Sequence, residues 1–503
     1  MKLKREYISD LIGNDYKNWT NGDRILINSP CGTGKTYFIK SLIAERKHTG
    51  FLIVSNRTNL KKQYWNDLRG NKNFTSICYQ RLQKELQKDN DYMKQYAIIV
   101  FDEIHHLLDS AKYDKYTDII YNEIINGDYS NNIMIFLSAT VGRFKDIFKT
   151  KFNNLKVYEQ LTTDYSYIDK VYMYKKPNSI IETIANDNTS SKWIIFVSNK
   201  NDGEKYKEEL RQHGIDCKFI YSDKKQSKET KETMDEIVNN CTFNSKVLIA
   251  TSILQEGVNL EDKSITNIVM ETWNEIATIQ SFSRVRVKID NPDRINLYIR
   301  KRSKNGINGK FRTIGKSFVL VNDFMKCTSI EAKAKFISEH YNRDTKSFFN
   351  KVDGVYYLDK DGSYKMNNLA YIKLMDDYWY FKELNDNIAD NENYQIQKVL
   401  KWFNLEDRTV IDLDEAIEEV HEETKADLLK VWINEHIEQR LFKEQQIELI
   451  ELIGLRDRRN NRLQKSISIL NAYLEENYNV QLTSKRVKIN NERFTIWEIS
   501  NME

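Results

Sequence analysis

Eight residues near the start of the chain could hold a phosphate group. The segment SPCGTGKT (29–36) follows a short apolar run, RILIN (24–28), and leads into a helical pattern. A glycine-rich turn between a strand and a helix points consecutive backbone N–H groups at a phosphate, with the positive end of the helix dipole behind them. The spacing therefore predicts a phosphate-binding loop in which Gly32, Thr33 and Gly34 form the cradle.

The last two residues of this segment complete the predicted chemistry. Lys35 would reach the β and γ phosphates of a nucleotide, and the Thr36 hydroxyl would ligate Mg²⁺. The strict pattern GxxxxGK[ST] is missed at its first position, where Ser29 stands. Cys31 is expected to be only a small residue of the loop. The alternative is a glycine turn that precedes a helix by chance.

A pair of carboxylates closes another apolar run, AIIVF (97–101), which Asp102 and Glu103 follow directly. Ligands of open α/β sheets collect at the carboxyl ends of the strands, so both acids should lie beside the phosphate-binding loop. Asp102 would hold Mg²⁺, and Glu103 would orient and deprotonate the attacking water. Adjacent acids at a strand end are otherwise often a solvated turn. The neighbouring His105 and His106 point in different directions, which favours core or coupling roles over metal binding.

The elements that must position these residues alternate along the chain. From about residue 24 to 300, short apolar runs alternate with longer amphipathic segments, in two groups separated by a polar stretch near 150–190. Continuous apolar strands separated by helix-length segments are typical of parallel sheets buried on both faces. The sequence predicts an α/β fold with two tandem parallel-sheet domains, at residues 1–162 and 163–330.

The rest of the chain has a different pattern. A basic, glycine-containing segment at 301–312 is expected to be a loop, and long helical patterns follow it, the longest at 414–454. These patterns predict a helical accessory domain at 331–465. The last segment, 466–503, combines a helical pattern with two β-rich runs joined by an Asn-Asn turn, which predicts a helix and a hairpin like those of a winged helix.

Composition narrows the class of protein. The 503-residue chain has 77 Lys and Arg and 73 Asp and Glu, a formal net charge of +4, so a basic surface for nucleic acid must be local. No apolar stretch approaches the roughly 18 residues of a membrane helix, and the first residues lack the apolar core of a secretory signal. We expect a cytoplasmic protein without membrane contact. Its five dispersed cysteines argue against a zinc site and a disulfide framework.

Together these motifs resemble those of superfamily 2 DExH-box helicases and translocases, which have two RecA-like domains. The resemblance covers roughly residues 20–300, and the motifs follow in the family's order. SNRTNLKKQ resembles motif Ia, which implies that Arg57 contacts nucleic-acid phosphates. TSICYQRL resembles the next nucleic-acid-binding motif, with Tyr79 and Gln80 as its candidates.

Two further motifs would link the nucleotide to the nucleic-acid strand. LSAT resembles motif III, which implies that Ser138 and Thr140 couple hydrolysis to domain movement. ATSILQEGVNL resembles motif V, which implies that Thr251 faces the strand. In the same motif, Gly257 and Asn259 would face the nucleotide.

The segment QSFSRVR resembles motif VI. The resemblance implies that Gln280 senses the γ-phosphate and that Arg284 or Arg286 is an arginine finger from the second domain. The family more often has QxxGRxGR, and its final arginine falls on Val287 here. Which arginine is the finger stays open.

The resemblance implies an NTP-dependent motor, with ATP and Mg²⁺ as cofactors, that binds a nucleic-acid strand across both domains, DNA favoured over RNA. The RTNLKKQ and SRVR segments resemble viral and mobile-element replication helicases in particular. The C-terminal region would steer the substrate or recruit protein partners. Two alternatives stay open. One is a duplex translocase that does not separate strands, and the other is a nucleotide-dependent binding switch in a replication or defence assembly.

Overall fold

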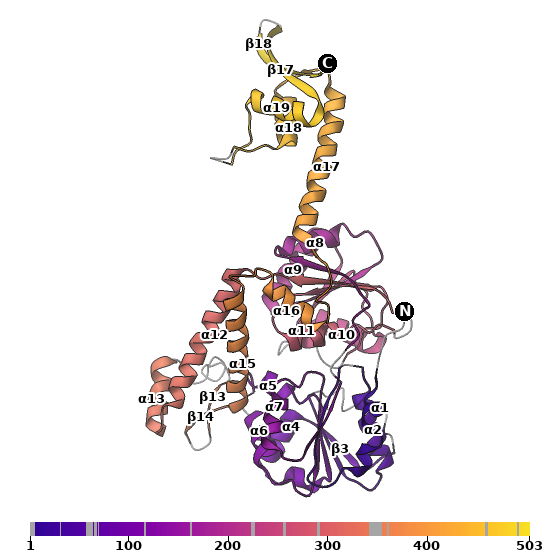
Figure 1. Ribbon diagram of the computed structural model, residues 1–503, viewed down its shortest axis with the longest axis vertical. Helices are drawn as coiled ribbons and strands as arrows, with labels where there is room; N and C mark the ends of the chain where they lie inside the picture. Colours follow the sequence, from indigo (N-terminus) through magenta and orange to yellow (C-terminus); the bar gives the residue numbers. More distant parts are fainter. Residues whose placement is uncertain are drawn as a thin grey trace. The chain divides into compact units, whose positions relative to one another are not determined.

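The computed structural model describes residues 6–30, 32–56, 64, 68, 70–114, 117–160, 163–222, 227–254, 258–288, 292–341, 355–359, 362–457, 461–489 and 492–502. The chain forms two compact units, residues 1–411 and 412–503 (Figure 1). The division between them falls inside the predicted accessory domain at 331–465. The four sequence-based domains stay predictions.

The first parallel sheet belongs to residues 6–160, which we call lobe 1. Its strands are β1 (Arg24–Asn28), β2 (Phe51–Ser55), β3 (Phe74–Cys78), β4 (Ile98–Phe101), β5 (Ile133–Ser138) and β6 (Leu155–Glu159), in the order β3-β2-β4-β5-β1-β6. Neighbouring residues of one strand pack on opposite faces. Leu26 packs with helices α4 (Tyr79–Leu86), α5 (His106–Ser110), α6 (Thr117–Asn126) and α7 (Arg143–Lys151), whereas Ile25 and Ile27 pack with α1 (Ile8–Ile12) and α2 (Lys35–Glu45). Both faces are therefore buried, which is why the strands are apolar throughout.

The second sheet belongs to residues 163–300, which we call lobe 2. Its strands are β7 (Ile168–Tyr174), β8 (Lys192–Phe196), β9 (Cys217–Ile220), β10 (Val247–Ala250), β11 (Ile265–Met270) and β12 (Ile295–Arg300), with β15 (Val410–Asp412) added at one edge, in the order β15-β7-β12-β11-β8-β10-β9. The helices between these strands are α8 (Pro177–Ala185), α9 (Lys200–Gln212), α10 (Lys228–Asn240) and α11 (Glu275–Phe282). The predicted pair of tandem parallel-sheet α/β domains is confirmed.

Two long helices, α12 (Lys304–Met325) and α15 (Asn368–Asn387), pack side by side and contact both lobes (Figure 1). Ile307 of α12 and Phe381 of α15 pack with Trp273 of lobe 2. At the other end of the pair, Val321 and Leu374 belong to the core of lobe 1. The pair therefore connects the two lobes independently of the chain that runs directly between them.

The predicted loop at 301–312 is wrong, because α12 begins inside it at Lys304. Ser303 caps the helix by accepting a hydrogen bond from the Gly306 N–H (3.1 Å). Apolar residues then follow at helical spacing, starting with Ile307 and Phe311. The cap and the buried face outweigh the roughly 1 kcal/mol that each glycine costs inside a helix. Among the described residues between α12 and α15 are the smaller elements α13 (Ile330–His340), β13 (Tyr356–Leu358) and β14 (Tyr364–Met366), and α16 (Tyr394–Trp402) follows α15.

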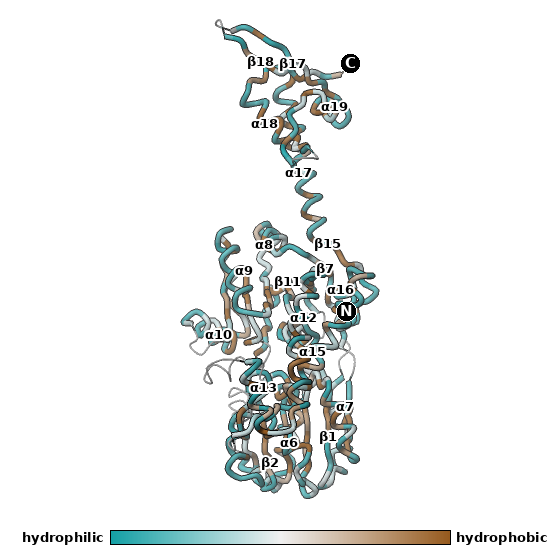
Figure 2. The backbone as a smooth tube through the Cα atoms, turned by 90° about the vertical axis from the view of Figure 1, so that its left-hand side faces the viewer, coloured by the Kyte–Doolittle hydropathy of each residue, from teal (hydrophilic) through white to brown (hydrophobic). Residues whose placement is uncertain are grey.

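The second unit contains α17 (Leu413–His436), β16 (Arg440–Leu441), α18 (Lys443–Ile453), α19 (Ile467–Tyr478) and the antiparallel hairpin β17 (Val480–Ile489) and β18 (Glu492–Asn501). The helical pattern at 414–454 is thus two helices with a short strand between them. Residues 418–428 of α17 are exposed, and the helix is largely hydrophilic there (Figure 2). The core forms around Trp432, Leu470 and Trp497. Among the described helices, none is long and apolar enough to cross a membrane.

Candidate active site

The segment 29–36 connects the end of β1 to the start of α2, at the carboxyl edge of the lobe 1 sheet. Gly32 and Gly34 have φ angles of 82° and 86°. Residues with a Cβ rarely adopt this left-handed conformation, so both positions require glycine. Thr33 is buried between them, and Cys31 lies outside the described residues.

Ser29, which replaces the first glycine of the strict pattern, supports the loop from inside. It is buried, and its hydroxyl donates to Thr33 Oγ1 (2.5 Å) and lies 3.2 Å from Gln160 Oε1. Thr33 Oγ1 donates in turn to the Pro30 carbonyl (2.8 Å). Gln160 was missed by sequence reasoning, because it follows β6 with no motif around it.

Lys35 and Thr36 stand on the first turn of α2. The Lys35 ammonium group is buried and donates to the carbonyls of Ser29 and Pro30, the latter at 2.9 Å. A triphosphate in this loop would compete with these carbonyls for the ammonium group. Thr36 is half-buried beside it, at the positive end of the helix dipole.

The two predicted carboxylates follow β4 and differ in their surroundings. Asp102 is buried, and burial together with the negative charge of Glu103 raises the pKa of Asp102 to about 7, although Lys35 acts in the opposite direction. A cation close to this carboxylate would remove that penalty, so the donor set fits Mg²⁺ held by Asp102 and Thr36. Glu103 has a φ of 52°, which is uncommon for a residue other than glycine and is often found at functional sites. Its Oε2 lies 3.5 Å from Nδ1 of His105.

His105 connects the lobes. Its buried ring lies between Ser138 Oγ, 3.0 Å from Nδ1, and the amide nitrogen of Gln280 in lobe 2, 2.7 Å from Nε2. Because the amide nitrogen donates, Nε2 accepts and the ring proton is on Nδ1, from which it is donated to Ser138. Ser138 Oγ also accepts from the Thr140 N–H (3.0 Å), and Thr140 Oγ1 lies 3.4 Å from the Gln280 amide. Residues of the predicted motifs III and VI therefore meet at one histidine.

The two candidate finger arginines have different partners. Arg284 is buried, and its Nε donates to the backbone carbonyl of Gln280 (3.2 Å). Arg286 Nε donates to Oδ1 of Asn259 (3.0 Å), the residue expected to face the nucleotide. Gly257 of the same motif lies outside the described residues. The finger role stays a prediction for both arginines.

The residues predicted to contact nucleic acid differ in their exposure to solvent. Tyr79 is only 1% exposed, and its hydroxyl donates to the backbone carbonyl of Asp102 (3.0 Å). In this structure Tyr79 therefore offers no surface to a nucleic-acid strand, because from the first turn of α4 it packs against the carboxylate turn, with its ring beside His106. Gln80 is exposed, Thr251 is half-buried after β10, and Arg57 lies outside the described residues. Their contacts with nucleic acid stay predictions.

Two family models match the sequence. The type III restriction enzyme, res subunit, matches residues 3–78 and 66–143. The helicase conserved C-terminal domain matches residues 175–288. Among curated proteins, none matches the chain.

Several solved structures resemble the chain at low identity. They include S. cerevisiae Dbp5 bound to RNA and ADP BeF3, with 16% identity, 60% of this chain and 88% of that chain covered, and a TM-score of 0.42. The Escherichia coli DEAH/RHA helicase HrpB has 10% identity over 81% of this chain and 61% of that chain, with a TM-score of 0.43. A fragment of a putative HsdR subunit of a type I restriction enzyme from Vibrio vulnificus YJ016 has 14% identity over 58% and 62%, with a TM-score of 0.40.

These identities and TM-scores are low, so the assignment depends on the two family models, which fall on lobe 1 and lobe 2 respectively. Lobe 1 holds the predicted phosphate-binding loop and the carboxylate pair, and lobe 2 holds Gln280 and the two arginines. The chain thus matches models of helicase-family domains in both lobes, and these matches support a superfamily 2 helicase.

Proposed function

We propose that the chain is an ATP-dependent motor of the DExH type that hydrolyses nucleotide between its lobes and thereby moves along, or unwinds, nucleic acid, DNA favoured over RNA. The observation that carries this proposal is the buried contact of 2.7 Å between His105 and Gln280. It connects the turn that follows the carboxylates with α11, the helix that precedes both candidate finger arginines.

Nucleotide binding would depend on lobe 1. The backbone N–H groups around Gly32, Thr33 and Gly34 would surround the phosphates, with Lys35 as their cation. Thr36 and Asp102 would hold Mg²⁺, which when bound supplies positive charge to the phosphate oxygens.

Hydrolysis would then require groups from both lobes. Glu103 would orient a water molecule and accept its proton, and its position beside His105 supports that role. Arg284 or Arg286 would stabilise the charge that develops on the transferred phosphoryl group. Asn259, which accepts from Arg286, would orient that side chain towards the nucleotide.

Coupling would pass through the buried hydrogen bonds at His105. A change of charge at the γ-phosphate would act on Glu103 and Gln280, and through them on Ser138 and Thr140. Because these groups bridge two rigid sheets, a change in their hydrogen bonds would favour a different arrangement of the lobes. Movement of the lobes would in turn act on a strand bound across both of them.

The test is a panel of ATP turnover rates without nucleic acid and with single- and double-stranded DNA and RNA, combined with strand-displacement and triplex-displacement assays. We expect at least one nucleic acid to stimulate turnover. Triplex displacement without strand displacement would indicate a duplex translocase. Turnover that is insensitive to DNA and RNA alike would contradict the motor and favour the nucleotide-dependent binding switch.

A further inference from the structure

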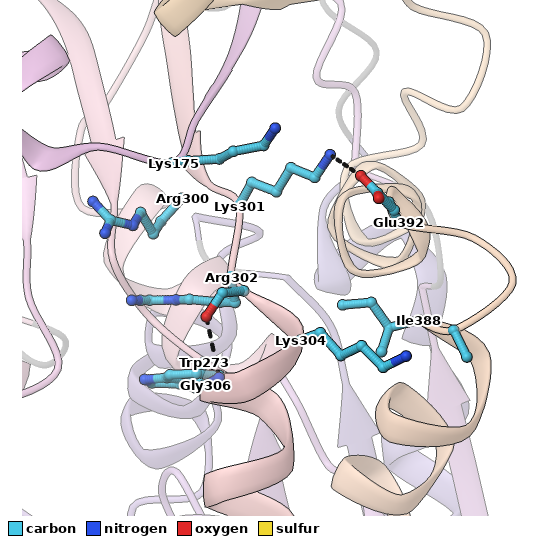
Figure 3. Close-up of a pocket in the computed structure, with 11 residues that line it drawn as sticks. Lys175, Trp273, Arg300, Lys301, Arg302, Lys304, Gly306, Ile388 and Glu392 are labelled. Atoms are coloured by element: carbon cyan, nitrogen blue, oxygen red, sulfur yellow. Dashed lines mark hydrogen bonds and ion pairs between the residues drawn. The ribbon is translucent and has the colours of Figure 1, made fainter. Parts of the chain in front are cut away.

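A basic pocket of about 550 Å³ lies on lobe 2, at the carboxyl ends of β7, β11 and β12 (Figure 3). The first turn of α12 and the segment after α15 complete its wall. None of its residues belongs to the motifs assigned to nucleotide. Five cations and one acid line it: Lys175, Arg300, Lys301, Arg302, Lys304 and Glu392.

The two arginines are held in place by their neighbours. They bind opposite oxygens of buried Glu271, with Nη1 of Arg300 3.6 Å from Oε1 and Nη1 of Arg302 3.1 Å from Oε2. The Arg302 guanidinium also lies over the Trp273 ring, 4.3 Å from its centre (Figure 3). Both arginines therefore form a fixed base of the pocket, with part of their charge neutralised by Glu271.

The positive charge of Lys301 is only weakly offset by its ion-pair partner, Glu392. Its side chain is only 10% exposed, and its ammonium group lies 3.7 Å from Glu392, whose side chain is 83% exposed (Figure 3). Burying a cation costs free energy unless a close partner offsets it, and a long pair with a solvated carboxylate offsets little. Five cations line the pocket, against Glu392 in its wall and Glu271 beneath the two arginines, so the site favours an anion.

The positive charge continues along α12. Exposed Lys304, Arg312 and Lys316 lie within about 120° of one another around the helix axis, and no Asp or Glu occurs from residue 304 to 322. At a rise of 1.5 Å per residue, Lys304 and Lys316 are about 18 Å apart along the axis. That distance is longer than a small anion but suits the repeated phosphates of a polymer. At the pocket, the positive end of the α12 dipole adds to the positive charge of the side chains.

We propose, given the proposed function, that the pocket and the basic residues of α12 bind the phosphates of a nucleic-acid strand. The contact is made to the backbone and is independent of base sequence. Lobe 2 thus holds the substrate at a place outside the motor motifs. The segment 301–312, which stood out in the sequence by its charge, supplies most of this site.

The test uses the full chain with Lys304→Gln and Lys316→Gln combined, both at exposed positions. Affinity for a labelled single-stranded oligonucleotide is measured as a function of salt. Each lost phosphate contact makes the slope of log K against log salt less negative by about 0.7, so we expect a change of about 1.4 and about 25-fold weaker binding at 0.1 M salt. The matched control is Lys231→Gln, at an exposed position of α10 next to the opposite edge of the sheet, which should leave affinity and slope unchanged.

An unchanged slope and affinity in the double variant, with a wild-type unfolding temperature, would overturn the proposal. A small phosphate compound is the other source of the same chemistry. It is tested by titrating inorganic tripolyphosphate without Mg²⁺ into the Lys35→Ala chain, with and without the double substitution. Pocket-dependent binding of tripolyphosphate alone would also overturn strand binding. Turnover of the wild-type chain with and without nucleic acid is measured in parallel. If nucleic acid stimulates it while the double variant binds normally, the pocket proposal fails and the motor proposal does not.

Discussion

The two lobes contribute to the candidate active site in different ways. In lobe 1 the predicted phosphate-binding loop, Asp102 and Glu103 follow strands of a single sheet, so one core fixes their relative positions. In lobe 2, Arg284 donates to Gln280 and Arg286 to Asn259, within their own lobe, whereas Gln280 reaches across to His105. We therefore expect lobe 1 to hold the binding and reacting groups, and lobe 2 to make turnover responsive to substrate.

Lys35→Ala should have the largest effect, because it removes the buried cation of the loop. We expect turnover to fall about 10³-fold, the upper end for loss of one group that stabilises phosphoryl charge, and nucleotide binding to weaken. Titration with a fluorescent nucleotide and steady-state turnover measure both. Lys47→Ala, at an exposed position just after α2, is the control. Wild-type turnover in Lys35→Ala would remove lobe 1 from the binding role.

Glu103→Gln should separate binding from chemistry within lobe 1. The amide keeps the shape of the side chain but cannot accept the proton from water, so turnover should fall about 10²-fold while nucleotide binding persists. Single-turnover kinetics and nucleotide binding check the two parts. If full turnover stimulated by nucleic acid remained, the assignment of Glu103 as general base would be wrong.

Gln280→Ala tests whether lobe 2 makes turnover responsive to nucleic acid. It breaks the contact with His105 but leaves the loop and carboxylates of lobe 1 intact. We expect stimulation by nucleic acid to fall about 10-fold, within the usual range of coupling free energies, with a smaller change in nucleotide affinity. Gln212→Ala, at an exposed position of α9, is the control. A variant that lost nucleotide binding as fully as Lys35→Ala would erase the proposed difference between the lobes.

Asp262→Asn should have the smallest effect, on the stability of lobe 2. Burial acts to raise the pKa of Asp262, but hydrogen bonds from Lys192 (2.7 Å), Ser264 and Thr242 outweigh it and lower the pKa below its ordinary value. A lowered pKa stabilises the folded state above the unfolded pKa of about 4, and this stability is lost as the pH falls through the folded value.

We expect the Asp262 substitution to cost about 1 kcal/mol near neutral pH, with the difference from wild type shrinking in acid. Hydrogen exchange of β10 and β11 at pH 7 and below pH 4 measures it. Asp216→Asn, at an exposed position of the same lobe, is the control. If the variant and the wild type were equally protected from exchange at both pH values, the Asp262 carboxylate would not stabilise lobe 2 through its charge.

The class of fold could be predicted from the sequence, and so could the positions of the glycine-rich turn and the acid pair at strand ends of lobe 1. Apolar runs predicted both parallel sheets, because buried strands are apolar on both faces. The glycines of the phosphate-binding loop and the acids after β4 were found because their spacing along the chain is local and their backbone requirements depend on residue type. The helix and hairpin expected at 466–503 also followed from local periodicity.

Contacts between residues far apart in the sequence could not be predicted and are known from the folded chain. His105 and Gln280 are 175 positions apart, and Ser29 and Gln160 are 131 positions apart. No sequence pattern predicted either contact. The structure also decided that Tyr79 is buried and that α12 and α15 connect the lobes. The periodicity of a sequence predicts which side of a helix or strand is apolar. Which other element covers that side depends on how all the elements of the unit pack together, and those elements are far apart in the sequence.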